Sequence, residues 1–233
     1  MRMFLATLFI IAMSGKQLYA QQVKSKSEIL SQAITSTIFT DDVVKQFNLL
    51  YPIRKVYSYQ DQSGAYYLVL CESIDDISKY DTLHQRIKAV NLKKDNNGLV
   101  KAWELNDFIN SSNVNSRQET SIWFWTKFCE AKDLDGDGNI DPLIVYGSSG
   151  DNGHDDGRIK IILNYKGQKI AVRHQNSTMD EGRNIQVDAA FYTLPQPIQL
   201  HIKQLMQTLS EKGFALYPHE YEKAMAQKKQ QIH

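Results

Sequence analysis

The chain has 233 residues, with 27 basic and 26 acidic side chains and a formal net charge of +1 at pH 7. This balance excludes the strongly basic surface that a nucleic acid or an anionic membrane needs from its main protein partner. The length is enough for one domain with a substantial hydrophobic core.

Residues 1–20 have the order of a secretory signal peptide. Arg2 precedes an apolar run over residues 3–13, and a polar stretch follows that ends at Ala20. The run is shorter than the roughly 20 residues of a transmembrane helix. Residue 21 is Gln and no Cys follows the run, so a lipid anchor has no acceptor there. We expect cleavage after Ala20 and a periplasmic mature chain without a membrane span; an uncleaved anchor is the alternative.

The mature chain is expected to begin with helices. Ser25 and Glu28 fit a capping box, and residues 27–38 (SEILSQAITSTI) have helical spacing. Thr40, followed by two aspartates, begins a second short helix that extends to about Asn48.

From Tyr51 onward the pattern is typical of β-strands. Val, Ile, Tyr, Phe and Trp are frequent, and turn sequences such as DQSG, DNNG, DGDGN, HDDG and YKGQ separate many of the apolar runs. We predict an antiparallel β-meander of about eight strands, over residues 53–59, 65–72, 85–94, 99–105, 121–130, 142–147, 158–165 and 169–175.

Helices are predicted again at the C-terminal end. Residues 187–194 suit a helical turn, and residues 195–213 form an amphipathic helix with Pro197 in its first turn and Gly213 at its end. A last helix is predicted within residues 218–230, followed by frayed residues. We therefore expect one α+β domain over residues 21–233, propeller-blade-like or sandwich-like, with helices at both ends.

The segment DLDGDGNID is the strongest motif in the sequence. Its acidic residues alternate around two glycines, so several carboxylates can point at one centre. Hard oxygen ligands in this number suit Ca²⁺, which takes about six to eight of them. The predicted ligands of one structural calcium ion are the side chains of Asp133, Asp135, Asp137 and Asp141 and the carbonyl of Asn139. An acidic turn without an ion is the alternative.

The motif departs from an EF-hand. The twelfth position, where an EF-hand has a bidentate Glu, is Ile144, and an apolar strand follows the loop. The loop resembles the calcium loops of FG-GAP and VCBS repeats, which join two strands of a β-propeller blade. A closed propeller is excluded, because this chain has one such loop and strands for about two blades, short of the usual four.

Other candidate sites are weaker. Cys71 and Cys129 form a disulfide or remain as two buried thiols. Residues 148–158 (SSGDNGHDDGR) suit a solvated hairpin loop, or else supply a further calcium ligand. Trp123 and Trp125 share one face of a strand, and Ile122 and Phe124 lie on the other. Apolar residues on both faces favour a buried central strand over stacking on a sugar. A polar cluster after the last strand is a candidate ligand-binding site or a surface loop: Arg173, His174, Gln175 and Asn176, with Asp180 and Arg183 nearby.

Over residues 39–218 the sequence resembles a family of small exported Gram-negative proteins described as surface polysaccharide biosynthesis proteins. The similar segments are FTDDVVKQFN, YPIRKVYSYQDQSGAYYLVLCESID, SIWFWTKFCEAKDLDGDGNIDPLIVYG, DDGRIKIILNYKGQKIAVRHQN and FYTLP. The resemblance implies a role in the cell envelope, in lipopolysaccharide production. It transfers no catalytic residue.

These observations predict a periplasmic binding or accessory protein with a structural calcium site, whose partner is an envelope polysaccharide or a periplasmic protein. Two other classes remain open. One is an envelope glycan hydrolase with carboxylates among Asp151, Asp155, Asp156 and Asp180. The other is an inhibitor or immunity protein that protects the cell from an envelope-degrading toxin.

Overall fold

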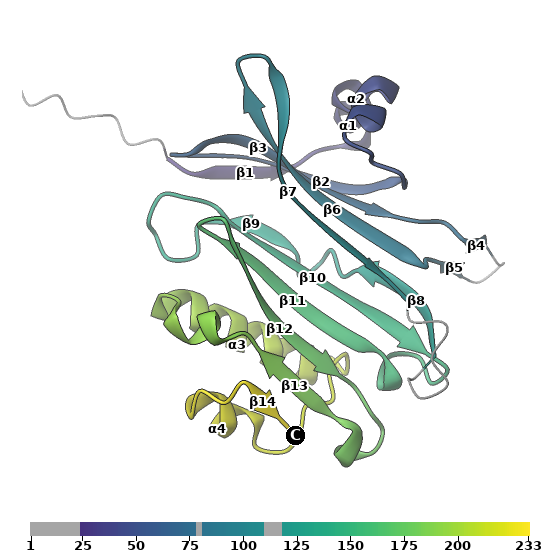
Figure 1. The fold of residues 1–233 in the computed structure, drawn as a ribbon, viewed down its shortest axis with the longest axis vertical. Coiled ribbons are helices and arrows are strands. Elements are labelled where there is room, and N and C mark those ends of the chain that lie inside the picture. Colours follow the sequence, from purple (N-terminus) through teal and green to yellow (C-terminus); the bar gives the residue numbers. More distant parts are fainter. Residues whose placement is uncertain (1–23, 78–80, 110–117) are drawn as a thin grey trace, which may run out of the picture.

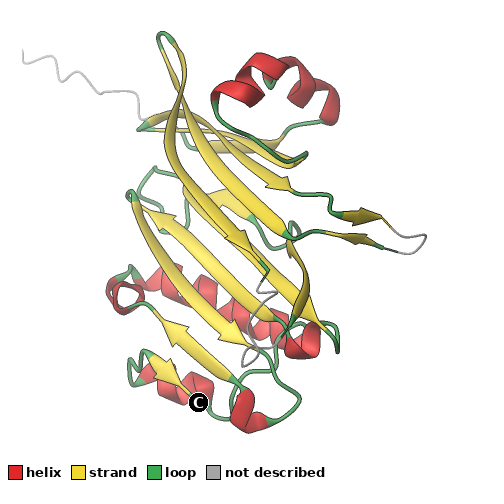
Figure 2. Cartoon of the chain, turned by 45° about the vertical axis from the view of Figure 1, so that its right-hand side comes forward, coloured by secondary structure: helices red, strands yellow, loops and turns green. Residues whose placement is uncertain are grey.

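The computed structural model describes residues 24–77, 81–109 and 118–233. The predicted signal peptide lies outside these residues. The described chain is a mainly antiparallel α+β fold, in which two large sheets face each other and helices lie on their outer sides (Figures 1 and 2). The predicted fold class is thus confirmed, in its sandwich-like form.

The first sheet has five antiparallel strands, and short turns make two of the four connections between them. Their spatial order is β1 (Lys26–Ile29), β2 (Ile53–Asp61), β3 (Gly64–Glu72), β6 (Arg86–Asp95) and β7 (Gly98–Phe108). A two-stranded hairpin, β4 (Asp76–Ile77) and β5 (Thr82–Leu83), extends from the connection between β3 and β6.

The second sheet has seven strands. Its order is β14 (Gln231–Ile232), β13 (Asn184–Val187), β12 (Gln168–Gln175), β11 (Arg158–Tyr165), β10 (Asp141–Gly150) and β8 (Glu119–Phe124), and β9 (Glu130–Lys132) also pairs with β10. The predicted strand over residues 121–130 is therefore two strands, because the chain turns between them and the Phe128 N–H bonds back to Trp125.

The helices cover the outer faces of the two sheets. They are α1 (Gln32–Ile38), α2 (Asp41–Gln46), α3 (Gln196–Glu211) and α4 (Tyr221–Ala226), with short 3₁₀ turns η1 (His154–Asp156), η2 (Asp180–Gly182) and η3 (Ala189–Thr193). α1 and α2 adjoin a small core on the first sheet, and α3 packs Ile198, Ile202 and Met206 into the main core. Both predicted N-terminal helices and the long C-terminal helix are thus present.

Two terminal segments differ from the sequence-based expectation. Residues 26–29 form β1 instead of a helix, because pairing with β2 satisfies their backbone groups; the helix begins only at Gln32, where Ser31 caps it. The last residues do not fray, because β14 pairs with β13 and Ile232 is buried.

Side chains alternate between the two faces of each strand, so the first sheet contributes to two separate cores. In β3, Leu68 and Leu70 face the second sheet and join the main core, whereas Val69 and Cys71 face α1 and α2. Side chains on the inner faces of both sheets therefore meet between them. The candidate functional site lies at one end of this interface.

Candidate metal centre and its surroundings

The acid-rich loop joins β9 to β10 at one edge of the sandwich, where Figure 1 shows it projecting beside both sheets. Gly136 and Gly138 have φ angles of 79° and 88°. This left-handed region is open to glycine and strained for most other residues. The two glycines thus let the loop fold back, so that aspartates from both of its ends approach each other.

Three of the four predicted carboxylates converge. Oxygen atoms of Asp133, Asp135 and Asp141 lie within 4.8 Å of one another. Two glycine N–H groups of the loop donate to Asp133 at 2.8 and 2.9 Å, and the Leu134 N–H donates to Asp141 at 3.0 Å. These bonds hold the carboxylates in place. Such an oxygen cluster fits a hard divalent cation, and nothing in it is specific to Ca²⁺.

Asp137 and Asn139 have other contacts. Asp137 Oδ2 pairs with Lys166 Nζ at 2.9 Å, and its Oδ1 accepts hydrogen bonds from the N–H and the side-chain amide of Asn139. Lys166 holds the pKa of Asp137 below its ordinary value, although burial opposes this shift. The structure therefore groups Asp137 with a lysine and leaves three carboxylates at the centre.

Asp141 is the buried member of the centre, at 2 % exposure. Burial raises the pKa of its carboxyl to about 7, the Leu134 N–H opposes this shift, and the neighbouring carboxylates of Asp135, Asp137 and Asp133 add to it. Burying a carboxylate beside others is costly unless a positive charge compensates it. A divalent cation would supply that charge.

The turn between β2 and β3 holds the loop from the first sheet. Asp61, which is 4 % exposed, accepts the Ile140 N–H at 2.9 Å and the Ser63 N–H at 2.7 Å. The Gln62 side chain donates to the Asp137 carbonyl at 3.4 Å. This support was not predicted from the sequence, because Asp61 in a DQSG turn has no local feature that links it to a loop so distant along the chain.

The turn between β11 and β12 encloses the loop from the second sheet. Tyr165 donates its hydroxyl to Asp135 Oδ2 at 2.9 Å, beside the ion pair of Lys166 with Asp137. These contacts orient two of the aspartates from outside. The centre is therefore supported by one turn from each sheet.

The polar cluster at residues 173–176 supports the fold. His174 and Asn176 are 4 % and 1 % exposed and lie 2.6 Å apart, from ring Nε2 to amide Oδ1. Arg173 pairs with Asp188 at 2.6 Å, and Gln175 donates to the backbone carbonyls of Asp156 and Gly157. These contacts favour the structural reading over ligand binding.

Residues 148–158 lie at the opposite end of β10 from the metal centre. Ser148 to Gly150 belong to β10 itself, and η1 forms the turn. The ten-residue length of β10 separates this hairpin from the loop, so the alternative that it supplies a calcium ligand is wrong. The exposed residues 151–153 fit the favoured solvated hairpin. Of the acids considered for hydrolysis, Asp156 accepts the Asn152 N–H at 3.0 Å and Asp180 pairs with Arg183.

The two tryptophans of β8 and the turn after it differ in burial. Trp125 is 6 % exposed in the main core, as expected, whereas Trp123 is half-buried. Both rings pack near the His154 ring, at centroid distances of 5.7 and 5.5 Å. Burial accordingly lowers the pKa of His154, although Asp155 opposes this shift.

The two cysteines are free thiols. Cys71 faces α1 and α2, and Cys129 lies in the main core on the other side of the first sheet. The backbone of that sheet lies between the two positions, so the disulfide alternative is wrong. Burial raises the pKa of each thiol to about 12.

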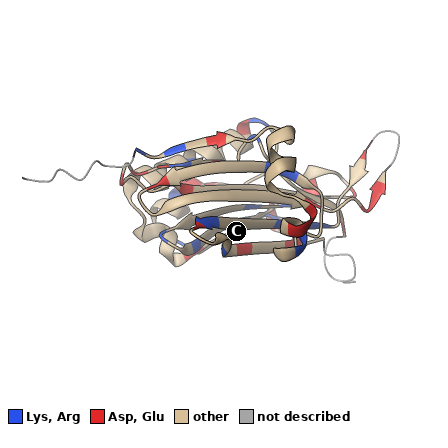
Figure 3. Ribbon diagram, turned by 90° about the horizontal axis from the view of Figure 1, so that it is seen from above, with Lys and Arg blue, Asp and Glu red and all other residues tan. Residues whose placement is uncertain are grey.

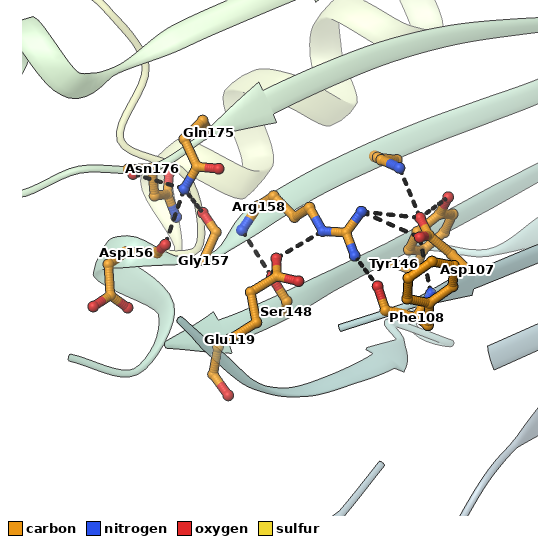
Figure 4. Close-up of polar contacts among 12 residues, drawn as sticks. Asp107, Phe108, Glu119, Tyr146, Ser148, Asp156, Gly157, Arg158, Gln175 and Asn176 are labelled. Carbon is orange, nitrogen blue, oxygen red and sulfur yellow. Dashed lines mark hydrogen bonds and ion pairs between the residues drawn. The ribbon is translucent and has the colours of Figure 1, made fainter. Parts of the chain in front are cut away.

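A charged network joins the two sheets at the other end of their interface (Figure 4). Asp107 of β7 contacts Arg158 Nη1 at 3.2 Å, Lys160 Nζ at 2.7 Å and the Tyr146 hydroxyl at 2.9 Å. Arg158 Nε also donates to Glu119 at 2.7 Å. Although burial favours the neutral acid, Lys160 and Arg158 hold the pKa of Asp107 below its ordinary value. We call this network the clamp, because its paired charges link the two sheets. No motif in the sequence predicted it.

In Figure 3, Lys and Arg are interspersed with Asp and Glu over both sheets. None of the helices in the described parts of the chain has the length and apolar character to cross a bilayer. Comparison with protein-family models, with curated proteins and with solved structures finds no match to this chain.

Proposed function

We propose that the chain is an exported, non-enzymatic binding or accessory protein that holds one structural Ca²⁺ and serves cell-envelope polysaccharide. The observation that supports the ion most directly is the convergence of three carboxylates, one of them buried. The order of residues 1–20 supports export, and the resemblance over residues 39–218 supports the envelope role.

A structural role for the ion follows from the enclosure of the loop. Asp61 and Tyr165 reach it from two different sheets, and Asp141 begins a central strand. An ion at this position fixes the contact between the sheets.

Calcium should raise the melting temperature of the mature protein, because an ion that binds only the folded state stabilises it by RT ln(1 + [L]/Kd). The gain is about 1.4 kcal/mol when calcium is tenfold above Kd. Asp135→Ala should abolish this response. Thermal unfolding in EDTA and in a calcium series measures it, and isothermal titration calorimetry gives the Kd.

Two further variants test whether the charge of Asp135 causes the response to calcium. Asp135→Asn retains an acceptor for the Tyr165 hydroxyl and removes only the charge, so it should also lose the response. Asp151→Ala removes an exposed acid at the far end of β10 and should respond like the parent. Equal melting of the parent with and without calcium would refute the calcium site.

A further inference from the structure

A cleft of ≈ 440 Å³ opens between the two sheets beside the acid-rich loop. The first sheet, the loop and the turn after β11 all contribute to it. Small-ligand sites commonly have volumes of about 300–1,000 Å³ and combine apolar walls with a few polar groups. Its lining includes Tyr59, Tyr66, Asn91, Trp103, Asp141 and Asn164.

The first sheet supplies an aromatic wall. The rings of Tyr59 and Tyr66 are stacked, with centroids 4.9 Å apart and planes 13° from parallel. Trp103 lies on the same inner face, opposite Asn91 in the register, and is half-buried. Rigid aromatic rings offer a ligand a flat apolar surface together with a polar edge.

Amide side chains supply polar groups around this wall. Asn91 is 2 % exposed and shares hydrogen bonds of 2.8 and 3.0 Å with the Tyr59 hydroxyl. Among the described residues, the Asn164 side chain and the Trp103 indole N–H have no hydrogen-bond partner, although both line the cleft. An amide presents a donor beside an acceptor, and an indole presents a donor. These groups are available to a ligand.

The charged groups of the cleft are already engaged. Asp61 accepts backbone N–H groups, Asp141 belongs to the metal centre, and Lys166 pairs with Asp137. What remains is an aromatic wall with uncharged donors and acceptors. We propose that this cleft binds a short, uncharged, hydroxyl-rich saccharide, with Trp103 packed against a sugar ring and Asn164 hydrogen-bonded to its hydroxyls.

This inference rests on the proposed function, since it identifies the place where an envelope polysaccharide would bind. It also connects the metal centre to binding. Ile140 and Asp141 belong both to the loop and to the cleft, and Asp61 fixes Ile140 against the first sheet. An ion that orders the loop would therefore shape one wall of the cleft.

The test uses the mature protein with calcium and, as the probe, an uncharged oligosaccharide of a few hexose units. In spectra of ¹⁵N-labelled protein, the chain gives three indole N–H signals, from Trp103, Trp123 and Trp125. We expect the probe to shift the Trp103 signal and to leave the Trp123 signal in place. Signals are assigned by substituting each tryptophan in turn.

Calorimetry with matched variants then measures affinity. Trp103→Ala should weaken binding at least tenfold, and Asn164→Ala severalfold. Trp123→Ala removes a half-buried tryptophan outside the cleft and should bind within twofold of the parent. Asn164 has no side-chain bond to lose within the described residues, so its variant keeps the test valid if Trp103→Ala misfolds.

The outcomes separate the two proposals. Absence of binding by the parent, or unchanged binding by both Trp103→Ala and Asn164→Ala, would overturn the saccharide cleft. Either result leaves the calcium site standing if calcium still raises the melting temperature. Loss of the calcium response with intact, cleft-dependent saccharide binding would overturn the ion alone.

Discussion

The carboxyl of Asp141 couples the metal centre to pH. Burial raises its pKa from 3.8 to about 7 in the folded chain without an ion. Between these two values the folded state holds a proton that the unfolded state has released. Stability in EDTA should therefore fall as pH rises through this window, by at most about 1.4 kcal/mol per pH unit from this group. Below pH 3.8 both states are protonated and the effect is absent.

Asp141→Asn tests this expectation, because the amide keeps an oxygen acceptor for the Leu134 N–H and cannot ionise. In EDTA, the variant should be increasingly more stable than the parent from pH 4 to pH 7. Urea unfolding of both proteins at several pH values measures the difference. A difference that does not change with pH would contradict the prediction. With calcium, the order should reverse, because the variant loses a ligand.

At the scale of elements, the clamp between the sheets depends on Asp107. Its removal leaves Arg158 with Glu119 and takes from Lys160 an ion-pair partner at 2.7 Å. Removing one member of a buried charge network lowers the free energy of unfolding by roughly 3–5 kcal/mol, because the remaining charge is left uncompensated. Since these groups are partly exposed, we expect Asp107→Ala to lose about 2–3 kcal/mol in urea unfolding.

An exposed ion pair provides the control. Asp180 pairs with Arg183 near the protein surface, with an acid that is 57 % exposed. Asp180→Ala should therefore cost less than about 1 kcal/mol. If Asp107→Ala costs no more than Asp180→Ala, the clamp does not hold the sheets together.

Local patterns predicted most of the elements. The runs rich in Val, Ile, Tyr, Phe and Trp that form β2, β3, β10, β11 and β12 all contain buried residues, and turn residues mark the ends of many of them. The N-terminal error at residues 26–29 has a clear origin. These residues are exposed in the structure, so their apolar spacing carried no information about packing. Pairing with β2 then decided their conformation.

At the scale of the whole molecule, the metal centre was predictable and its setting was not. Asp133, Asp135 and Asp141 belong to one short segment with diagnostic spacing, so their convergence follows from the sequence. The support from Asp61 and the clamp of Asp107 with Arg158 join residues 79 and 51 positions apart. Such contacts depend on how the two sheets dock, which local periodicity does not encode. The cleft is invisible in the sequence for the same reason.

The bond from Asp61 to Ile140 also bears on how fast the protein folds and unfolds. It closes across 79 residues and joins the two sheets, so we expect it to form late in folding. We expect the buried environment of Asp141 to arise at the same stage. An interaction absent from the folding transition state changes the unfolding rate and leaves the folding rate nearly unaltered.

Calcium should accordingly slow unfolding. In stopped-flow experiments, the unfolding rate should drop about tenfold for each 1.4 kcal/mol that calcium adds to stability, with little change in the folding rate. An equal acceleration of folding would show instead that the loop is ordered in the transition state. Because the contact between Asp61 and Ile140 would close late, the ion would control how long the native state lasts more than how fast it forms.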